Sequence, residues 1–408
     1  MSYREELILL RGRGRVSALG TNGQAYAAAT SGFTTRQQGP AALPVAALPP
    51  ETNGQLVALS RQHPAYRQLD RTVLLAILAA RQASAQAGWA RHPEAALAVS
   101  IGSSRGAAGR LEHHHHQFLT TGTTAVAASP LTTLGNVASW VAFDAGSTSG
   151  AALSHSSTCS SAFQALGNAV AWLRAGMAGR FLAGGAEAPL TPFTLAQMQA
   201  LGIYSSLEAT QFPCRPGAGK PSTFVLGEGA AVFALEMVSR AALLTERAGQ
   251  AAFQPAFCLE SVGFGFEAIG SKTGLSAQGH HFQAAMRMAL AQAGCAPAAI
   301  DAVVLHSPGT PAGDAAERQA LRAVFGTNLP DITSNKWLLG HTLGASAALS
   351  LDYACQLLAT QSWPAPPFAT DLTPAPSRPI RRVLVNAAGF GGNAASALVS
   401  VVCGTGAP

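Results

Sequence analysis

The sequence predicts an α/β fold, in which short apolar strands alternate with helices along the whole chain. The chain has 408 residues, of which 48% are hydrophobic and only 11% are charged. A chain this apolar can offset the entropy of ordering by burial, which predicts a large core or a large subunit interface. Two segments also read alike, ALAVSIGSSRG at 96–106 and DAVVLHSPGTPAG at 301–313. Each is an apolar strand that opens into a glycine-containing loop before a helix, which indicates two duplicated halves.

The individual elements follow from these patterns in chain order. The expected strands are short apolar runs: Leu97–Ile101, Phe181–Ala183, Ala230–Leu235, Ala302–Leu305, Val383–Val385 and Ala397–Val402. The expected helices are longer: Asp70–Gln86, Ser160–Ala178, His280–Ala293, Asp314–Phe325 and Thr342–Thr360. The stretch Glu246–Gln254 is the expected junction, so we divide the chain into residues 1–248 and 249–408.

Composition and charge exclude several classes of protein. The net charge is +6, but the basic residues are scattered and no Lys/Arg run is interleaved with aromatics, which argues against a nucleic-acid partner. No stretch reaches 18 uninterrupted apolar residues, so no membrane span is expected. The apolar run near the N-terminus is too short for a secretory signal, which predicts a cytoplasmic protein. The six cysteines lie far apart without a C-x-x-C pair, which favours free thiols over disulfides or a zinc site.

Cys159 is the candidate nucleophile. It stands between an extended stretch and a helix that carries no charge until Arg174, so this helix is expected to be buried. Unpaired N–H groups and the dipole at a helix N-terminus favour a thiolate, which predicts a lowered pKa for Cys159. The alternative is that Cys159 is one more small buried hydrophobe, as free cysteines often are. Its place between strand and helix disfavours that alternative.

Two histidines are candidates for the same site. His306 ends an apolar strand and precedes a tight loop that can present its ring to a cavity. His341 follows Gly340 and precedes a helix of small residues. A run of four further histidines, 113–116, invites a metal interpretation. Consecutive residues on a helix point in different directions, however, and no spaced Cys or carboxylate set accompanies them, so no metal site is predicted.

Seven blocks in order resemble the signatures of the β-ketoacyl-[acyl-carrier-protein] synthases, the type II condensing enzymes of the thiolase superfamily. The first three are SSTCSSA around Cys159, LAGGAEA at 182–188 and CRPGAGKPSTFVLGEGAAVFALE at 214–236. The others are GRGRVSALG at 12–20, HSPGTPAGD at 306–314, SNKWLLGHTLGASAA at 334–348 and NAAGFGGNAA at 386–395. The resemblance implies a thiolase-like five-layered α-β-α-β-α fold of two duplicated halves. Residues 1–248 would carry the nucleophilic cysteine, and residues 249–408 the two catalytic histidines.

The resemblance also implies a role for each site residue. Cys159 would accept an acyl chain, while His306 and His341 would help to decarboxylate malonyl-carrier protein and stabilise its enolate, giving a 3-oxoacyl product. Lys336 would order the histidines, with Asp314 and Glu317 in support. The backbone N–H groups of Cys159 and Phe390 would form the oxyanion hole. Phe390 would also gate the acyl pocket, with room to move provided by Gly389 and Gly391.

The resemblance further implies partners and cofactors. An acyl-carrier protein would deliver both substrates on its phosphopantetheine arm, so no metal or organic cofactor is expected. Surface arginines, among them Arg61, Arg67 and Arg71, would attract this acidic partner. The chain would form a dimer, either with itself or with a second ketosynthase-like subunit.

Two departures from the family pattern leave alternatives open. Ser307–Pro308 stands where the family usually has Gly-Thr, and Ser350 where it usually has a glutamate. These departures indicate a divergent member, such as a secondary-metabolism synthase that makes polyene pigments, and leave fatty-acid and polyene or polyketide elongation as alternatives. They also keep open a chain-length-factor-like, non-elongating partner subunit, against which Cys159, His306, His341 and Lys336 argue. A decarboxylase without elongation is a third alternative. A thiolase, which would need a second catalytic cysteine such as Cys403, is disfavoured because Cys403 lies after the late glycine loop.

Overall fold

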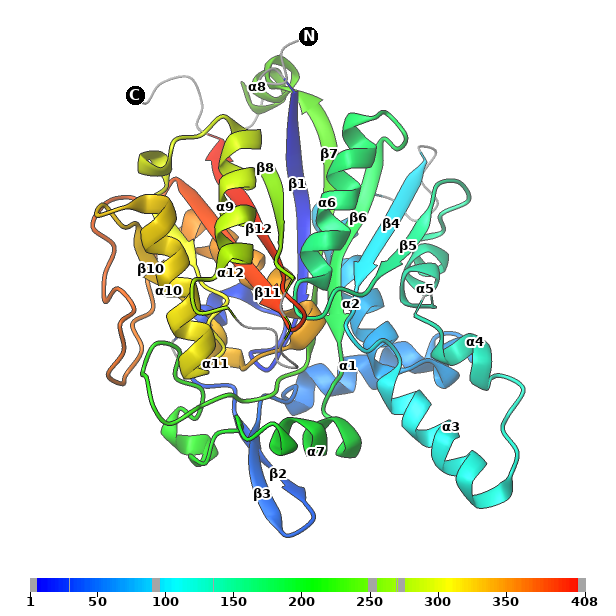
Figure 1. The fold of residues 1–408 in the computed structure, drawn as a ribbon. Helices are drawn as coiled ribbons and strands as arrows, with labels where there is room; N and C mark the ends of the chain where they lie inside the picture. The colour runs from blue at the N-terminus through cyan, green and yellow to red at the C-terminus, as the bar shows by residue number, and fades with distance from the viewer. Residues whose placement is uncertain are drawn as a thin grey trace.

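The computed structural model describes residues 6–28, 30–89, 96–134, 136–248, 255–268, 270 and 276–402 (Figure 1). The strands in these residues are β1 (Glu6–Val16), β2 (Thr34–Gln38), β3 (Ala41–Val45), β4 (Leu97–Gly102), β5 (Ala152–His155), β6 (Arg180–Glu187), β7 (Gly229–Ser239), β8 (Ala256–Phe266), β9 (Ala302–Val304), β10 (Asp331–Thr333), β11 (Arg382–Gly389) and β12 (Asn393–Val402). The α-helices are α1 (Pro50–Arg61), α2 (Arg71–Gln86), α3 (Ala108–Thr121), α4 (Ala128–Thr132), α5 (Asn136–Ala145), α6 (Ser161–Arg174), α7 (Pro192–Ala200), α8 (Arg240–Ala248), α9 (His280–Ala293), α10 (Pro311–Phe325), α11 (Lys336–Leu339) and α12 (Ser346–Thr360). Short 3-10 turns link them: η1 (Gly23–Tyr26), η2 (Pro64–Gln68), η3 (Ala209–Gln211), η4 (Pro297–Ala299) and η5 (Leu343–Ala345).

The two halves repeat one strand order. In the described residues, a ten-stranded sheet runs β10-β9-β11-β12-β8-β1-β7-β6-β4-β5, so each half contributes five strands outward from the centre. In both halves the first two pairings from the centre are antiparallel and the outer two are parallel. Within the described ranges, the sheets of the two halves pair where β1 meets β8, through Leu9–Cys258 and Leu10–Phe257. This repetition confirms the predicted duplication.

The strands of the two halves and the helices that cover them form five layers. Helices α2 and α5 cover the outer face of the first half, and α9 covers the outer face of the second half with α10 packed against it. Helices α6 and α12 lie between the halves, where α6 packs on β4 and β6 and also on β8, and α12 packs on β11 and β12 and also on β7. The thiolase-like layering is therefore confirmed. The boundary proposed between residues 248 and 249 borders residues outside the described ranges and stays a prediction.

Strand β1 approaches α2 closely because its glycines face that helix. A Cβ atom on Gly12 or Gly14 would lie 2.1 or 1.9 Å from a carbonyl oxygen of α2, so neither position accepts a larger residue without a shift. Gln82 and Gln86 of α2 accept hydrogen bonds from two β1 backbone N–H groups, at 3.0 and 2.7 Å. These bonds satisfy donors that β1 would otherwise leave unpaired beyond its short contact with β8.

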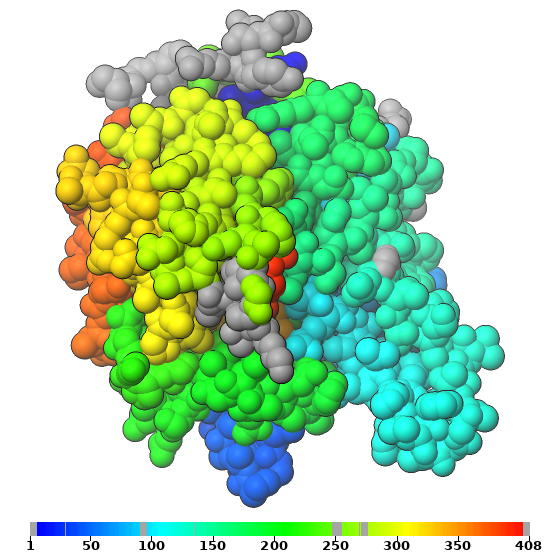
Figure 2. Space-filling model, viewed as in Figure 1, coloured from blue at the N-terminus to red at the C-terminus, as the bar shows by residue number. Residues whose placement is uncertain are grey.

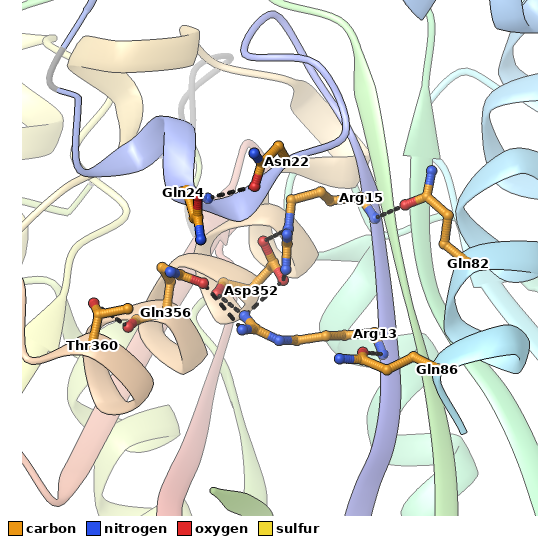
Figure 3. Close-up of polar contacts among 9 residues, drawn as sticks. All are labelled: Arg13, Arg15, Asn22, Gln24, Gln82, Gln86, Asp352, Gln356 and Thr360. Atoms are coloured by element: carbon orange, nitrogen blue, oxygen red, sulfur yellow. Dashed lines mark hydrogen bonds and ion pairs between the residues drawn. The ribbon is translucent and has the colours of Figure 1, made fainter. Parts of the chain in front are cut away.

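The opposite face of β1 carries arginines that reach the central helix α12 (Figure 3). Asp352 is fully buried and accepts hydrogen bonds from both Arg13 and Arg15, with Arg15 Nη2 at 2.7 Å and Arg13 Nη1 at 3.1 Å from Oδ1. Arg13 Nη2 also lies 3.1 Å from Gln356 Oε1. Burial by itself would raise the pKa of Asp352, but the two guanidinium charges outweigh it and lower that pKa. We name Arg13, Arg15 and Asp352 the β1–α12 ion cluster.

Two segments protrude from the body of the molecule. The space-filling view shows the β2–β3 hairpin below the body and the α3 region at its side (Figure 2). No helix in the described ranges combines the length and apolar character that a membrane span requires.

Candidate active site

Cys159 lies at a sharp turn between β5 and α6. Thr158 just before it has a φ of 52°, in the left-handed region, and Ser160 just after it is the N-cap of α6. Cys159 is 9% exposed as a residue and packs in an apolar cluster that includes Leu195, Phe224 and Leu343. A non-glycine residue in the left-handed region is strained, and such strain persists only where the surroundings hold it. The turn therefore presents the sulfur at the buried start of the central helix.

His341 lies against the sulfur of Cys159. Its Nε2 is 3.1 Å from Cys159 Sγ, and its Nδ1 is 3.2 Å from the hydroxyl of Ser346, the first residue of α12. The backbone of His341 is fixed as well, because its N–H donates to Val225 O at 2.8 Å and its carbonyl accepts from Gly227 N at 3.0 Å. The cysteine of one half and the histidine of the other thus form a hydrogen-bonded pair.

His306 completes the group from the end of β9. Its ring is 5.2 Å from the ring of His341 between centroids, at 90°. Glu317 holds the backbone on which this ring stands: its carboxylate accepts from His306 N at 2.9 Å, from Ser307 N at 2.8 Å and from Ser307 Oγ at 2.7 Å. Asn386 donates to the same carboxylate at 3.1 Å. Ser307, a departure from the family pattern, therefore anchors the loop instead of facing the pocket.

Burial sets the protonation of these groups. Burial lowers the pKa of His341 well below its usual range, and the charge of Lys336 lowers it further. The pKa of His306 is lowered in the same way, by burial first and then by His341 and Lys336. Both imidazoles are therefore neutral near pH 7, with one N–H donor and one acceptor nitrogen each.

The predicted lowering of the Cys159 pKa is wrong. Burial raises the pKa of the Cys159 thiol to about 12, and the nearby carboxylate of Glu187 adds to the increase, while Lys336 and Arg105 only partly oppose it. Cys159 also precedes the N-cap instead of standing in the first turn of α6. The thiol is consequently protonated at neutral pH, and its activation requires a base, for which His341 Nε2 is in place.

Lys336 is buried behind the two histidines. It is 1% exposed, and its Nζ donates to Ser350 Oγ at 3.3 Å. Ser350 in turn donates to Asn335 Oδ1 at 3.1 Å. Burial lowers the pKa of Lys336 to about 8, although the charge of Glu317 works against this change. Ser350, the second departure, thus gives this lysine a hydroxyl where the family pattern would place a carboxylate.

The lowered pKa of Lys336 predicts that the stability of the protein depends on pH. Between about pH 8, the value in the folded protein, and 10.5, the unperturbed value, the unfolded chain binds the proton and the folded chain does not. The free energy of unfolding should therefore rise with pH in this range, by up to about 3 kcal/mol relative to a Lys336→Met variant. Urea unfolding from pH 7 to pH 10 measures the difference. The exposed Lys220 provides the control: Lys220→Met should track the wild type, and parallel curves for all three proteins would contradict the assignment.

The other two supporting residues occupy different places. Glu317 holds the His306 loop, as described above. Asp314 lies on the same helix, α10, but its carboxylate accepts from Gly217 N at 2.8 Å, in the loop of the CRPGAGKP block. Burial raises the pKa of Asp314 to about 7. Asp314 thus joins two loops and does not touch either histidine ring.

The late glycine loop lies directly against the nucleophile. A Cβ on Gly389 would be 1.7 Å from Thr158 Oγ1 and 2.8 Å from Cys159 N, so only glycine allows this approach. Gly391 has a φ of 88°, which favours glycine. Phe390, between them, is 40% exposed. The loop thus stands beside the Cys159 backbone N–H, at the edge of the buried site.

Sequence reasoning missed several residues that shape the site. Phe224 packs edge-on against His341, with ring centroids 5.5 Å apart. Glu187 is fully buried and accepts from the Ser103 hydroxyl at 2.9 Å and from Gly344 N at 2.9 Å, which ties the loop after β4 to the turn before α12. Phe224 and Glu187 stand inside quoted blocks, but nothing in a single sequence indicates these contacts. The sequence likewise does not indicate that Ser346 contacts His341 Nδ1.

Other sequence candidates lie elsewhere. The histidines at 113–116 belong to α3, which protrudes from the body, and His113 contributes to a cavity of about 440 Å³ with Arg67, Arg71 and Arg110. Across the described ranges, no three His, Cys, Asp or Glu side chains are arranged to hold a metal ion. Cys403 lies outside the described residues.

Known proteins resemble this chain both in sequence and in fold. The family models described as "Beta-ketoacyl synthase, N-terminal domain" and "Beta-ketoacyl synthase, C-terminal domain" match residues 24–241 and 258–367. The chain is 32% identical to Nodulation protein E of Rhizobium sp. (strain N33) over 349 residues, which are 79% of this chain and 81% of that protein. It is 27% identical to 3-oxoacyl-[acyl-carrier-protein] synthase 2 of Staphylococcus aureus over 346 residues, 80% of this chain and 83% of that one. The solved structure titled "The ishigamide ketosynthase/chain length factor" superimposes with a TM-score of 0.82 at 21% identity, covering 98% of this chain and 100% of that chain.

Proposed function

Because the chain belongs to the β-ketoacyl synthase family, and is thus an acyl-transferring condensing enzyme, we propose that it is a 3-oxoacyl-[acyl-carrier-protein] synthase. In this proposal it joins an acyl chain held on Cys159 to a malonyl unit by decarboxylative Claisen condensation. The observation that carries the proposal is the contact of 3.1 Å between His341 Nε2 and Cys159 Sγ, with His306 beside it.

The first half-reaction transfers an acyl group to Cys159. His341 Nε2 accepts the proton of the thiol, and the sulfur attacks the carbonyl carbon of the acyl thioester. The oxyanion that forms accepts hydrogen bonds from the backbone N–H groups of Cys159 and Phe390. Collapse of the intermediate breaks the bond to the carrier thiol, which leaves with the proton from His341. Support comes from the neutral state of His341 and from the glycine loop beside Cys159 N.

The second half-reaction lengthens the chain by two carbons. The malonyl thioester loses CO2, and the N–H groups of His306 and His341 donate to the enolate oxygen. For this step His341 takes the tautomer with its proton on Nε2, which Ser346 permits because its hydroxyl can donate to Nδ1 as well as accept from it. The enolate carbon then attacks the Cys159 thioester, and the sulfur leaves as a thiolate. The one proton that the overall reaction consumes comes from water and restores the thiol through His341 Nε2. Two neutral imidazoles suit this step because each has an N–H to donate, and the lowered pKa values of His306 and His341 support it.

The remaining roles extend the same proposal. Lys336 supplies a buried positive charge that keeps the histidines neutral, and Phe390 moves to admit the acyl chain. No metal or organic cofactor takes part, since the substrates arrive on phosphopantetheine. The acyl-carrier protein docks near the cavity that Arg67, Arg71 and Arg110 line, where an acidic partner would be attracted. The compartment is the cytoplasm.

The test uses the purified protein with a panel of acyl-carrier proteins that hold different acyl chains, with malonyl-carrier protein, and with Cys159→Ala as control. Intact mass should show an acyl adduct on the wild type and 3-oxoacyl products that are two carbons longer, both lost in the variant. Absence of acylation with every chain would overturn elongation by the isolated protein. Formation of acetyl-carrier protein alone would show decarboxylation without elongation.

A chain-length-factor-like role is the second candidate. The structure named "ishigamide ketosynthase/chain length factor" shares the fold over 98% of this chain, and Ser350 departs from the family pattern beside Lys336. In this candidate the chain shapes the pocket of an active ketosynthase within a heterodimer. Activity that appears only after a second ketosynthase is added, and that survives Cys159→Ala, would establish it. The acyl panel also decides between fatty-acid and polyene or polyketide elongation.

A further inference from the structure

A buried histidine outside the proposed catalytic set joins two walls of the site. His281, in the first turn of α9, is fully buried, and Glu267 follows directly after β8. Glu267 Oε2 lies 3.2 Å from His281 Nδ1 and accepts from the His281 backbone N–H at 3.3 Å. This double contact fixes both the ring and the start of the helix. Neither residue belongs to the blocks that carry the family resemblance.

On one side this pair holds the glycine loop. The backbone N–H of Glu267 donates to Gly392 O at 3.0 Å, and a Cβ on Gly392 would lie 1.9 Å from Glu267 O. The other end of that loop, Gly389, lies against Cys159 N, as described above. The loop that carries Phe390 is therefore held by Glu267 at one end and by the nucleophile turn at the other.

On the other side the pair reaches the wall behind His306. The ring of Phe282, next to His281 in α9, lies 4.7 Å from the His281 ring and 6.2 Å from the His306 ring, between centroids. Gly265 allows α9 to approach β8, because a Cβ there would lie 2.0 Å from His281 O. His281 thus sets the position of the aromatic ring that packs on His306.

The burial of His281 indicates that the contact of its Nδ1 with Glu267 is structurally important. Its Nε2 is buried and has no hydrogen-bond partner within the described part of the chain. An unsatisfied buried nitrogen costs free energy that a leucine of similar size would avoid. The contact of Nδ1 with Glu267 is what a leucine would lose.

We propose that Glu267 and His281 are a positioning pair, which fixes the Phe390 loop and the Phe282–His306 wall relative to each other for the condensation step. The kinetic part of this inference rests on the proposed function. The structural part does not, because the pair should order residues 389–392 whatever reaction the site performs.

The test compares His281→Leu, which removes the donor, with His281→Asn, whose amide keeps an N–H near the position of Nδ1, and with Glu267→Gln. His280→Leu, at the exposed neighbouring histidine, is the matched control. Single-turnover acylation of Cys159 and formation of 3-oxoacyl product are followed by intact mass. Hydrogen exchange of peptides covering 386–395 and 159–166 reports the order of the loop and of the nucleophile helix.

We expect His281→Leu to slow condensation by about tenfold or more, because condensation depends on both the Phe390 loop and His306. Acylation depends on the loop but not on His306, so it should slow at least threefold less. Exchange at 389–392 should accelerate while exchange at 159–166 stays unchanged, and His281→Asn should recover most of both. Three results would each contradict the proposed positioning role of Glu267 and His281. These are equal slowing of both half-reactions, unchanged hydrogen exchange at 389–392, and an equal effect of His280→Leu. If the wild type forms no 3-oxoacyl product, the proposed function fails, and the exchange data alone decide the inference.

Discussion

Replacing His341 with alanine should slow the acylation of Cys159 by about 10²- to 10⁴-fold, whereas replacing His306 with alanine should leave acylation within about threefold of the wild type. The difference follows from geometry and protonation. His341 Nε2 is 3.1 Å from Cys159 Sγ, and the thiol, with its pKa raised to about 12, cannot ionise at neutral pH without a base. His306 contacts the ring of His341, but no hydrogen bond joins it to the sulfur in the described structure. Condensation should fail in both variants, because the proposed enolate needs both imidazoles.

Intact mass separates the two half-reactions in a single experiment. Acyl-carrier protein alone gives the rate of acylation, and malonyl-carrier protein added to the acylated enzyme gives the rate of condensation. Ser346→Ala is the graded control, since it removes only the partner of His341 Nδ1 and should cost far less than His341→Ala. Equal acylation rates in His341→Ala and His306→Ala would contradict the assignment of His341 as the base.

Replacing Asp352 with alanine should lower the free energy of unfolding by about 3–5 kcal/mol. The carboxylate is fully buried and balances Arg13 and Arg15, whose side chains are only 11% and 12% exposed. Without it, two guanidinium charges stay buried between β1 and α12 with no counter-charge. Asp352→Asn, which keeps the hydrogen-bond acceptor but loses the charge, should cost less. Urea unfolding of the three proteins measures the effect.

A surface ion pair provides the comparison for this prediction. Glu246 pairs with Arg11 at 2.8 Å and is 45% exposed, so Glu246→Ala should cost about 0–1 kcal/mol. Similar losses for Asp352→Ala and Glu246→Ala would contradict the role of the β1–α12 ion cluster. The pH dependence has a definite sign. The folded protein lowers the pKa of Asp352, so its contribution is present above about pH 4 and is lost as pH falls through the lower, folded value.

The sequence predicted the apolar elements well and the mixed ones poorly. His280–Ala293 is confirmed to the residue, and Asp70 is the N-cap of the helix expected at Asp70–Gln86. Strands β1 and β8 escaped detection because polar residues and glycines interrupt their apolar pattern, arginines in β1 and Glu260 and Ser261 in β8. Those glycines face α2 and α9, and two of the arginines face α12, so the irregular residues serve packing partners that are remote in sequence. The helix expected at Ser160–Ala178 ends early, at Arg174.

The candidate site, like the fold, could be predicted only in part from the sequence. The structure brings together Cys159, His306 and His341, which the motifs had pointed out, and it puts Lys336 behind them. Their protonation could not be predicted, because a local rule for helix N-termini does not contain the burial that raises the pKa of Cys159. Nor could the contacts of Glu187, Ser346 and His281. The partners of Glu187 lie 84 and 157 residues away. The contacts of Ser346 with His341 and of His281 with Glu267 are closer in the chain, but they depend on loop geometry that apolar periodicity does not describe.

The repeated strand order has a consequence for how the reaction centre arose and how it can fail. Cys159 lies just before Ser160, the N-cap of α6, and His341 lies just before η5 and α12. Each half thus places one chemical group close to the start of its own central helix. The pair that exchanges a proton is therefore a contact between the halves, whose sheets pair through Leu9–Cys258 and Leu10–Phe257 in the described residues. A misplacement of about 1 Å can cost two orders of magnitude in rate. Catalysis in this chain thus depends on the relative alignment of the two duplicated halves. Substitutions far from Cys159 that loosen the contact between the halves should abolish activity without changing a catalytic residue.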